Sequence, residues 1–241
     1  IVRVGDASEF TGDGVTGSNV RNITFKGFQL RWDVARHTPS KGVGTICLHM
    51  NNAMKMNLDV CLYGGEFAAF GYSCWGTQGS IKIDSCHKGI YWDAVSKTPE
   101  KSTEGGSTTS HNIELQIDHT IFPVYLRNCN YAKFHGWFEG ALTSMAHYDY
   151  TNETAMGITL DSCDGVIFDM GVEAWQGALL NCIGSVEAEF SFAMLPSEIL
   201  PSGLGTQGVA YRVRSLMSAT DETAIPNADR SMSYVKGYST V

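Results

Sequence analysis

The sequence predicts an all-β fold, a right-handed parallel β-helix, and three observations support this prediction. Short segments of alternating apolar residues recur along the chain, whereas apolar residues at helical spacing are hard to find. The 241 residues include 26 glycines and only 6 prolines, as expected for many short strands joined by tight turns. A cysteine-containing segment also repeats with the same internal spacing, which is typical of a solenoid.

The clearest repeat aligns residues 128–140 with residues 162–174. In this alignment Cys129, Phe134 and Glu139 correspond to Cys163, Phe168 and Glu173, and each glutamate follows its cysteine by ten residues. In a parallel β-helix such positions stack on one another at a rise of about 4.8 Å. A Greek-key sandwich or jelly roll is the alternative, but it would not give identical turns locked in register.

The spacing of the cysteines indicates the length of one coil. The step from Cys163 to Cys182 predicts a coil of about twenty residues. The step from Cys129 to Cys163 is much longer, so it needs one coil plus an excursion, which residues 143–156 supply. A similar excursion is expected at residues 96–110, after a further copy of the repeat at Cys86.

Two regions are expected along the chain. Residues 1–195 form the β-helix body, and residues 196–241, where the repeat fails, form a C-terminal segment that caps the body or helps it to trimerise. A disordered end is the alternative for that segment. Because the chain begins at Ile1 and its first methionine is Met50, we expect a fragment or a processed product, and no signal peptide is visible.

Composition excludes several classes of function. With 43% hydrophobic and 17% charged residues, the chain is too apolar for a disordered protein and too weakly charged for a coiled coil. A net charge of −8 without a basic run argues against nucleic acid as a partner, and no apolar stretch is long enough to insert into a membrane. Dinucleotide, P-loop, GxSxG and HExxH motifs are absent, so no cofactor is expected.

The seven cysteines are predicted to be buried free thiols. Their number is odd, none lies in a CxxC pair, and no spacing matches a zinc site, so no metal is expected. Buried thiols behave as small hydrophobic groups and fit synthesis in a reducing cytoplasm.

The chain resembles the bacteriophage tailspikes of the pectate-lyase-like superfamily. The resemblance rests on residues 19–27, on the Asn/Ser-Cys turns and on the Gly-Trp-Phe-Glu-Gly segment at 136–140, and it covers about residues 15–195. It implies a homotrimer on the virion tail that is made in the host cytoplasm and acts at the host surface. It also implies a groove that binds bacterial surface polysaccharide, without fixing the reaction. Phe67, Phe70 and Tyr72 are expected on an exposed wall that a partner would cover.

Glu139 and Glu173 are the best candidates for catalysis. If their copies are adjacent coils, both carboxylates lie on one face, near the separation of about 5 Å found in retaining glycosidases. One pKa of such a pair should rise, which would provide a general acid, and Asp169 could extend the set. A solvated acidic ladder is the alternative.

Aromatic side chains around this pair could stack on sugar rings. Trp137 and Trp175 each lie two residues from one of the glutamates, and Trp92 lies further along the chain. Packing under a loop or at a trimer interface is the alternative.

A polysaccharide lyase would need a cation and a base instead. Arg127 and His135 are the substrate-binding candidates for this chemistry, and Tyr131 and Lys133, at alternate positions, could share a face with His135. Three functions therefore stay open: a glycoside hydrolase that depolymerises capsule or O-antigen, a lyase on the same fold, and a non-catalytic adhesin or stalk.

Overall fold

The structure is a computed structural model that describes residues 2–4, 20–31, 46–94, 108–139, 156–173, 178–183, 186–194, 211–214 and 234–240. Within these ranges every regular element is a β-strand, and all strand pairs are parallel. The prediction of an all-β chain built from parallel strands is confirmed. In the same ranges, no helix has the length and hydropathy to span a membrane.

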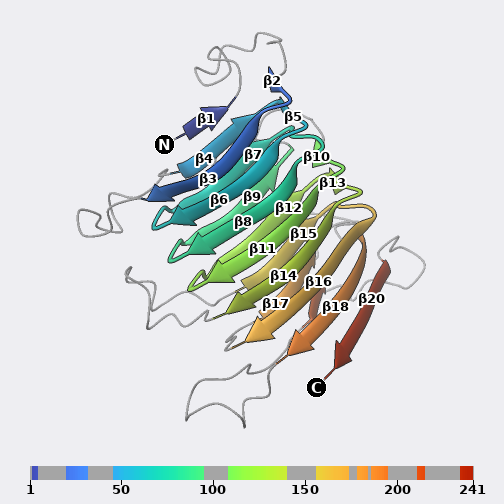
Figure 1. Ribbon diagram of the computed structural model, residues 1–241. Coiled ribbons are helices and arrows are strands. Elements are labelled where there is room, and N and C mark those ends of the chain that lie inside the picture. The colour runs from blue at the N-terminus through green and yellow to red at the C-terminus, as the bar shows by residue number, and fades with distance from the viewer. Residues whose placement is uncertain are drawn as a thin grey trace.

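Most strands belong to two eight-stranded sheets, which lie one behind the other in the view of Figure 1. Sheet A contains β1 (Val2–Val4), β4 (Ile46–Asn51), β7 (Phe67–Tyr72), β9 (Lys88–Asp93), β12 (Phe122–Arg127), β15 (Met156–Asp161), β17 (Ala178–Ile183) and β19 (Tyr211–Arg214). Sheet C contains β3 (Thr24–Arg31), β6 (Asn57–Tyr63), β8 (Gln78–Asp84), β11 (Asn112–Asp118), β14 (Lys133–Glu139), β16 (Val166–Glu173), β18 (Glu187–Met194) and β20 (Tyr234–Thr240). Two further sheets have two strands each: β2 (Val20–Arg21) pairs with β5 (Ala53–Met54), and β10 (Thr108–Thr109) pairs with β13 (Cys129–Asn130).

The chain passes alternately through sheet A and sheet C, and each pass adds one strand to each sheet (Figure 1). Asn57 pairs with Gln78, and Val166 pairs with Ala188, so one coil takes about twenty residues. The sequence separation between register partners is larger for Gln78 and Asn112, because residues 95–107 intervene. The same lengthening occurs across residues 140–155. The predicted period and both excursions therefore agree with the strand register, although the excursions lie mostly outside the described residues.

Residues with positive φ turn the chain after many of the described strands. Ser73, Ser85, Asn128 and Ser162 have φ between 49° and 55° and directly precede cysteines. Asparagine and serine suit this left-handed region because their short polar side chains bond locally. The thiols of Cys74, Cys86 and Cys163 donate to the carbonyl two residues before them, at 3.5 to 3.6 Å. The repeated Ser/Asn-Cys motif is thus a corner of the chain.

The cysteine alignment predicted from sequence is right in one part and wrong in two. Cys129 and Cys163 follow sheet A strands at the same corner, and their neighbours Asn130 and Asp164 form a bridge. Cys86 instead follows a sheet C strand, and Cys182 lies inside β17 opposite Leu160. Similar corners occur at both sheets, so the local motif alone does not identify which corner a cysteine occupies.

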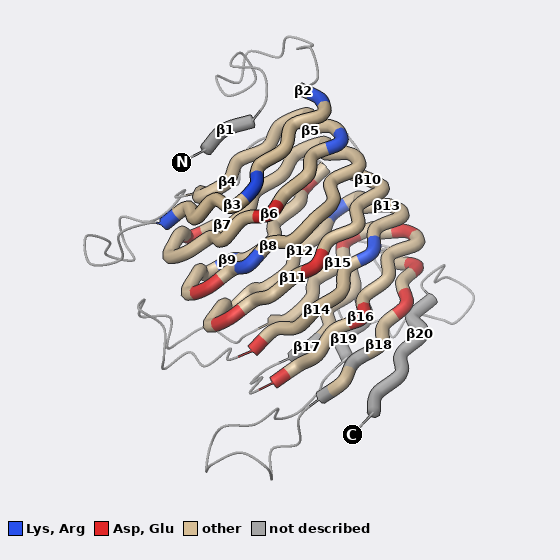
Figure 2. The backbone as a smooth tube through the Cα atoms, in the orientation of Figure 1, with Lys and Arg blue, Asp and Glu red and all other residues tan. Residues whose placement is uncertain are grey.

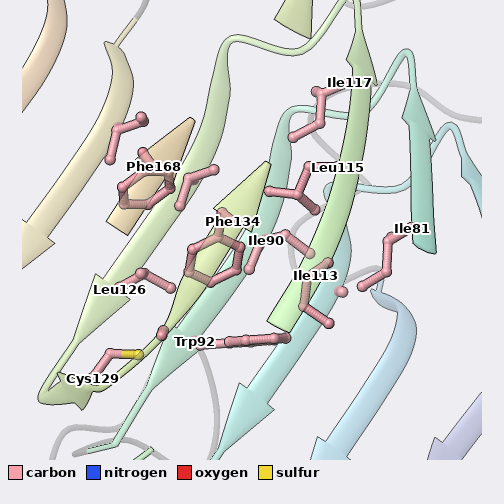
Figure 3. Packing of buried hydrophobic residues seen from close by; sticks show 14 of the residues in the cluster. Ile81, Ile90, Trp92, Ile113, Leu115, Ile117, Leu126, Cys129, Phe134 and Phe168 are labelled. Carbon is pink, nitrogen blue, oxygen red and sulfur yellow. The ribbon is translucent and has the colours of Figure 1, made fainter. Parts of the chain in front are cut away.

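One hydrophobic core fills the space between the sheets. Side chains at alternate strand positions point inward and stack on their register partners. Phe134, Phe168 and Phe190 form one such column, with ring centroids 4.9 and 5.6 Å apart. Figure 3 shows Phe134 and Phe168 among the aliphatic residues of this core.

A second, smaller cluster contains Ile46, Phe67, Phe70 and Tyr72. The expectation that Phe67, Phe70 and Tyr72 lie on an exposed wall is wrong, because all three are buried within the single chain. Their rings pack on one another and on Tyr91, with Phe67 and Phe70 edge to face at 5.9 Å.

The described part of the C-terminal segment extends both sheets. β19 pairs with β17, and β20 pairs with β18, both in parallel. Strand pairing therefore continues past residue 195, where the sequence repeat becomes hard to recognise. Whether this segment caps the body or serves trimerisation stays a prediction.

Candidate functional site: an acidic row on sheet C

Four carboxylates line up at the ends of neighbouring strands in sheet C. The last residues of β8, β11, β14 and β16 are Asp84, Asp118, Glu139 and Glu173, and each is the register partner of the next. Figure 2 shows these acidic ends side by side. We call this set the acidic row. Strand spacing places neighbouring members about 4.8 Å apart at their backbones.

The predicted adjacency of Glu139 and Glu173 is confirmed, since they are direct register partners on β14 and β16. Both side chains are partly exposed. Asp169 does not join this pair: it lies four residues before Glu173, about 13 Å along an extended strand. Its register partner is His135. The catalytic role of all three carboxylates stays a prediction.

Asp118, in the middle of the acidic row, has a raised pKa. Partial burial raises the pKa of its carboxyl to about 6, aided by the negative charges of Glu139 and Asp84 and opposed by His119. His119 itself lies 3.3 Å from Asp84, from its Nδ1 to the carboxylate oxygen. Neither Asp118 nor His119 was among the site residues predicted from the sequence. The spacing of one coil between Asp118 and Glu139 is the signal that would have identified Asp118.

Trp137 is an exposed aromatic residue beside the acidic row. It points outward from β14, two residues before Glu139, with 37% of its surface exposed. Its register partner on β16 is Gly171, which has no side chain to cover the indole ring. Trp137 therefore has the exposure that stacking on a sugar requires.

The other two predicted tryptophans differ from Trp137. Trp175 lies outside the described residues. Trp92 is fully buried, so the prediction that it offers a surface for sugar is wrong. Figure 3 shows Trp92 among the buried residues of the core. Its ring packs on His111, and Gly71 on the adjacent strand makes room for it.

The structure does not bring the predicted lyase residues together. Arg127 ends a strand of sheet A, where its guanidinium lies 3.8 Å from Asp93 and 3.4 Å from Asp161. His135 lies on sheet C, where it shares the outward face with Lys133. Tyr131 is at the corner before β14 with φ of 53°. Arg127 and His135 thus belong to different sheets.

A polar groove crosses the beginnings of the sheet C strands. It has a volume of about 470 Å³, and its walls include Asn57, Gln78, Asn112, Glu114 and His135. The three amide side chains are successive register partners, so they repeat at strand spacing. The Nδ1 atom of His135 is buried and has no hydrogen-bond partner within the described ranges.

In the described part of the chain, no group of three or more His, Cys, Asp or Glu side chains could hold a metal ion. Comparisons of the chain with protein-family models, with curated proteins and with solved structures found no match. The fold and the site together define an all-β protein of parallel strands with an acidic row on one outward face.

Proposed function

We propose that the chain is a right-handed parallel β-helix that binds bacterial surface polysaccharide and depolymerises it by glycoside hydrolysis. The regular alternation between two parallel sheets, with a period of about twenty residues, supports the solenoid. Crossovers between parallel strands of one sheet are right-handed in about 98% of cases, which supports the hand.

The juxtaposition of Asp118 and Glu139 is the observation that carries the proposed chemistry. Their strands are neighbours, and retaining glycosidases hold two carboxyl groups about 5 Å apart. With a pKa of about 6, Asp118 is protonated in a larger fraction of molecules than an ordinary aspartate, and this proton can pass to the glycosidic oxygen. Glu139 then attacks the anomeric carbon, and the leaving sugar departs with the proton from Asp118.

The second half of the reaction uses the same two groups. The carboxylate of Asp118 takes a proton from water, whose oxygen displaces Glu139 from the anomeric carbon. Glu173, on the other side of Glu139, is the alternative partner, as the pair predicted from sequence requires. Substitution of each carboxylate in turn distinguishes the two pairs.

Glycan contacts are proposed along the outward face of sheet C. Trp137 gives a flat apolar surface next to the acidic row. The amides of Asn57, Gln78 and Asn112 lie at the opposite ends of the strands and can exchange hydrogen bonds with sugar hydroxyls. A strand of seven residues is about 20 Å long, so the two regions can contact different units of one chain.

Charge favours hydrolysis over the lyase reaction. A lyase must bind a uronate carboxylate, which the acidic row would repel. The cation predicted for that role, Arg127, lies beside two aspartates on sheet A. The homotrimer and the place on a virion tail rest on the resemblance to tailspikes alone, since the three aromatic residues expected at a subunit interface are buried within one chain.

The test is incubation of the protein with a panel of capsular and O-antigen polysaccharides, followed by size-exclusion chromatography and a reducing-end assay. We expect shortened chains without the ultraviolet absorbance of an unsaturated sugar. Asp118→Asn and Glu139→Gln should each lower the rate about 10²- to 10⁴-fold. Glu187→Gln, on an exposed residue at the start of β18, is the matched control and should leave the rate unchanged. Binding without shortening would favour the adhesin or stalk.

A further inference from the structure

The outward face of sheet A carries a column of aromatic side chains that the proposed function does not use. Phe70, Tyr91 and Tyr125 are successive register partners on β7, β9 and β12. The rings of Tyr91 and Tyr125 stack with centroids 4.3 Å apart and an interplanar angle of 10°. Tyr91 also stacks on Phe70, at 5.7 Å and 14°. The rings therefore repeat at about the spacing of the strands.

This stack of rings stops after Tyr125. The next register partner is Thr159 on β15, followed by Asn181 on β17. Because threonine fills less space than an aromatic ring, one face of Tyr125 borders a recess. The recess has a volume of about 360 Å³, and its walls also include Phe122 and Met156. We call it the Tyr125 pocket.

A polar atom in the wall of the Tyr125 pocket lacks a partner. The side-chain oxygen of Asn181 is buried and accepts no hydrogen bond from the part of the chain that the structure describes. Leaving a buried acceptor unpaired is unfavourable. Rotation of the Asn181 amide toward the recess would bring this oxygen to a donor on a ligand, so the amide favours a ligand with hydroxyl groups.

We propose that the Tyr125 pocket binds one pyranose ring of a neutral saccharide. A pyranose has an apolar C–H face and hydroxyl groups around its edge. Its C–H face packs on Tyr125 in the place of the next aromatic ring, and one hydroxyl donates to the Asn181 oxygen once the amide turns toward the recess. The site lies on sheet A, whereas the acidic row lies on sheet C, so the inference does not depend on catalysis by that row.

The test is isothermal titration calorimetry of the full chain with maltotriose, cellotriose and tri-N-acetylchitotriose. We expect at least one of them to bind, and Asn181→Leu to weaken its binding about tenfold or more. Thr159→Tyr should abolish binding without loss of stability, because the new ring fills the recess and continues the stack. Thermal unfolding of each variant shows whether the fold is retained.

Two control variants locate the effect. Tyr131→Leu removes an exposed tyrosine from a corner of the chain and should leave the affinity unchanged. Asp118→Asn should also keep full binding, which separates this site from the acidic row even if no polysaccharide is cleaved.

Several results would overturn the inference. These are the absence of binding at millimolar trisaccharide, equal binding by Thr159→Tyr, and tighter binding of adenosine, a flat aromatic comparison ligand. Self-association of the protein that Thr159→Tyr disrupts, without any saccharide binding, would instead assign the pocket to a second copy of the chain.

Discussion

Asp118 and Glu139 are direct register partners on β11 and β14, and the charge of Glu139 adds to partial burial in raising the pKa of Asp118 to about 6. Removing that charge should lower the pKa of Asp118. We therefore expect Glu139→Gln to shift the Asp118 titration to lower pH, as measured by carbon-13 NMR of its carboxyl group. Glu173→Gln is the control, because Glu173 is two strands away from Asp118. An unchanged midpoint in Glu139→Gln would show that the charge of Glu139 does not contribute, and that burial and Asp84 raise the pKa without it.

Two tryptophans that look alike in the sequence should respond in opposite ways to substitution. Trp92 is fully buried between the sheets, so Trp92→Ala should lower the free energy of unfolding by about 3–5 kcal/mol. Trp137 is exposed on sheet C, so Trp137→Ala should change it by no more than about 0.5 kcal/mol. Urea unfolding of both variants measures the difference. In the polysaccharide assay Trp137→Ala should weaken binding, and equal affinity with the unsubstituted protein would remove Trp137 from the proposed site.

Burial predicts which thiols react in the native protein. Six of the seven cysteines are buried, and burial raises the pKa of Cys74, Cys163 and Cys182 to about 12. Cys61 is partly exposed, so a thiol-reactive dye should label it first, although burial also raises its pKa. Mass spectrometry of the native and urea-unfolded protein locates the label. Fast native labelling that persists in Cys61→Ser would contradict the burial of the others.

Strand register could be predicted from sequence where two adjacent coils share a long identical pattern. Cys129, Phe134 and Glu139 match Cys163, Phe168 and Glu173 in one alignment, and the structure pairs Phe134 with Phe168 and Glu139 with Glu173. Short motifs were less informative, because Asp-Ser-Cys occurs after β8 in sheet C and after β15 in sheet A.

The direction in which a side chain points was the second feature that could not be predicted from the sequence. Trp92 and Trp137 both lie in alternating segments, and only the register of the sheets shows that one faces the core and the other faces outward. Asp118 gains its raised pKa from burial and from charges on two other strands, none of which its own neighbours in the sequence reveal.

A buried histidine links two coils through a defined set of hydrogen bonds. The backbone N–H of Thr77 donates to Nδ1 of His111 at 3.3 Å. The hydroxyl of Thr108 donates to the carbonyl of Cys74 at 2.7 Å and lies 2.9 Å from Nε2 of His111. Nε2 must carry a hydrogen, because the hydroxyl proton of Thr108 is already used. Nδ1 carries none, because it accepts from Thr77, so His111 is neutral. Burial lowers the pKa of His111 to about 3.

Acid should therefore weaken the fold through His111. Between about pH 6.5, where an unfolded histidine titrates, and pH 3, the unfolded chain binds a proton that the folded chain excludes, so stability falls as the pH falls. His111→Leu should cost about 1–3 kcal/mol at pH 7, because it leaves the Thr77 N–H without its acceptor. The difference from the unsubstituted protein should shrink as the pH drops from 7 to 4, as measured by urea unfolding.

His119→Leu is the control for this experiment, since His119 is partly exposed and contacts Asp84 rather than the core. It tests whether any histidine gives the same result. Carboxylates also titrate in this pH range, but they do so equally in the unsubstituted protein and in His111→Leu. The difference in stability between these two proteins therefore reports on His111 alone. A constant difference from pH 7 to pH 4 would mean that His111 can take up its proton inside the folded chain, and the neutral hydrogen-bonded arrangement would then be wrong.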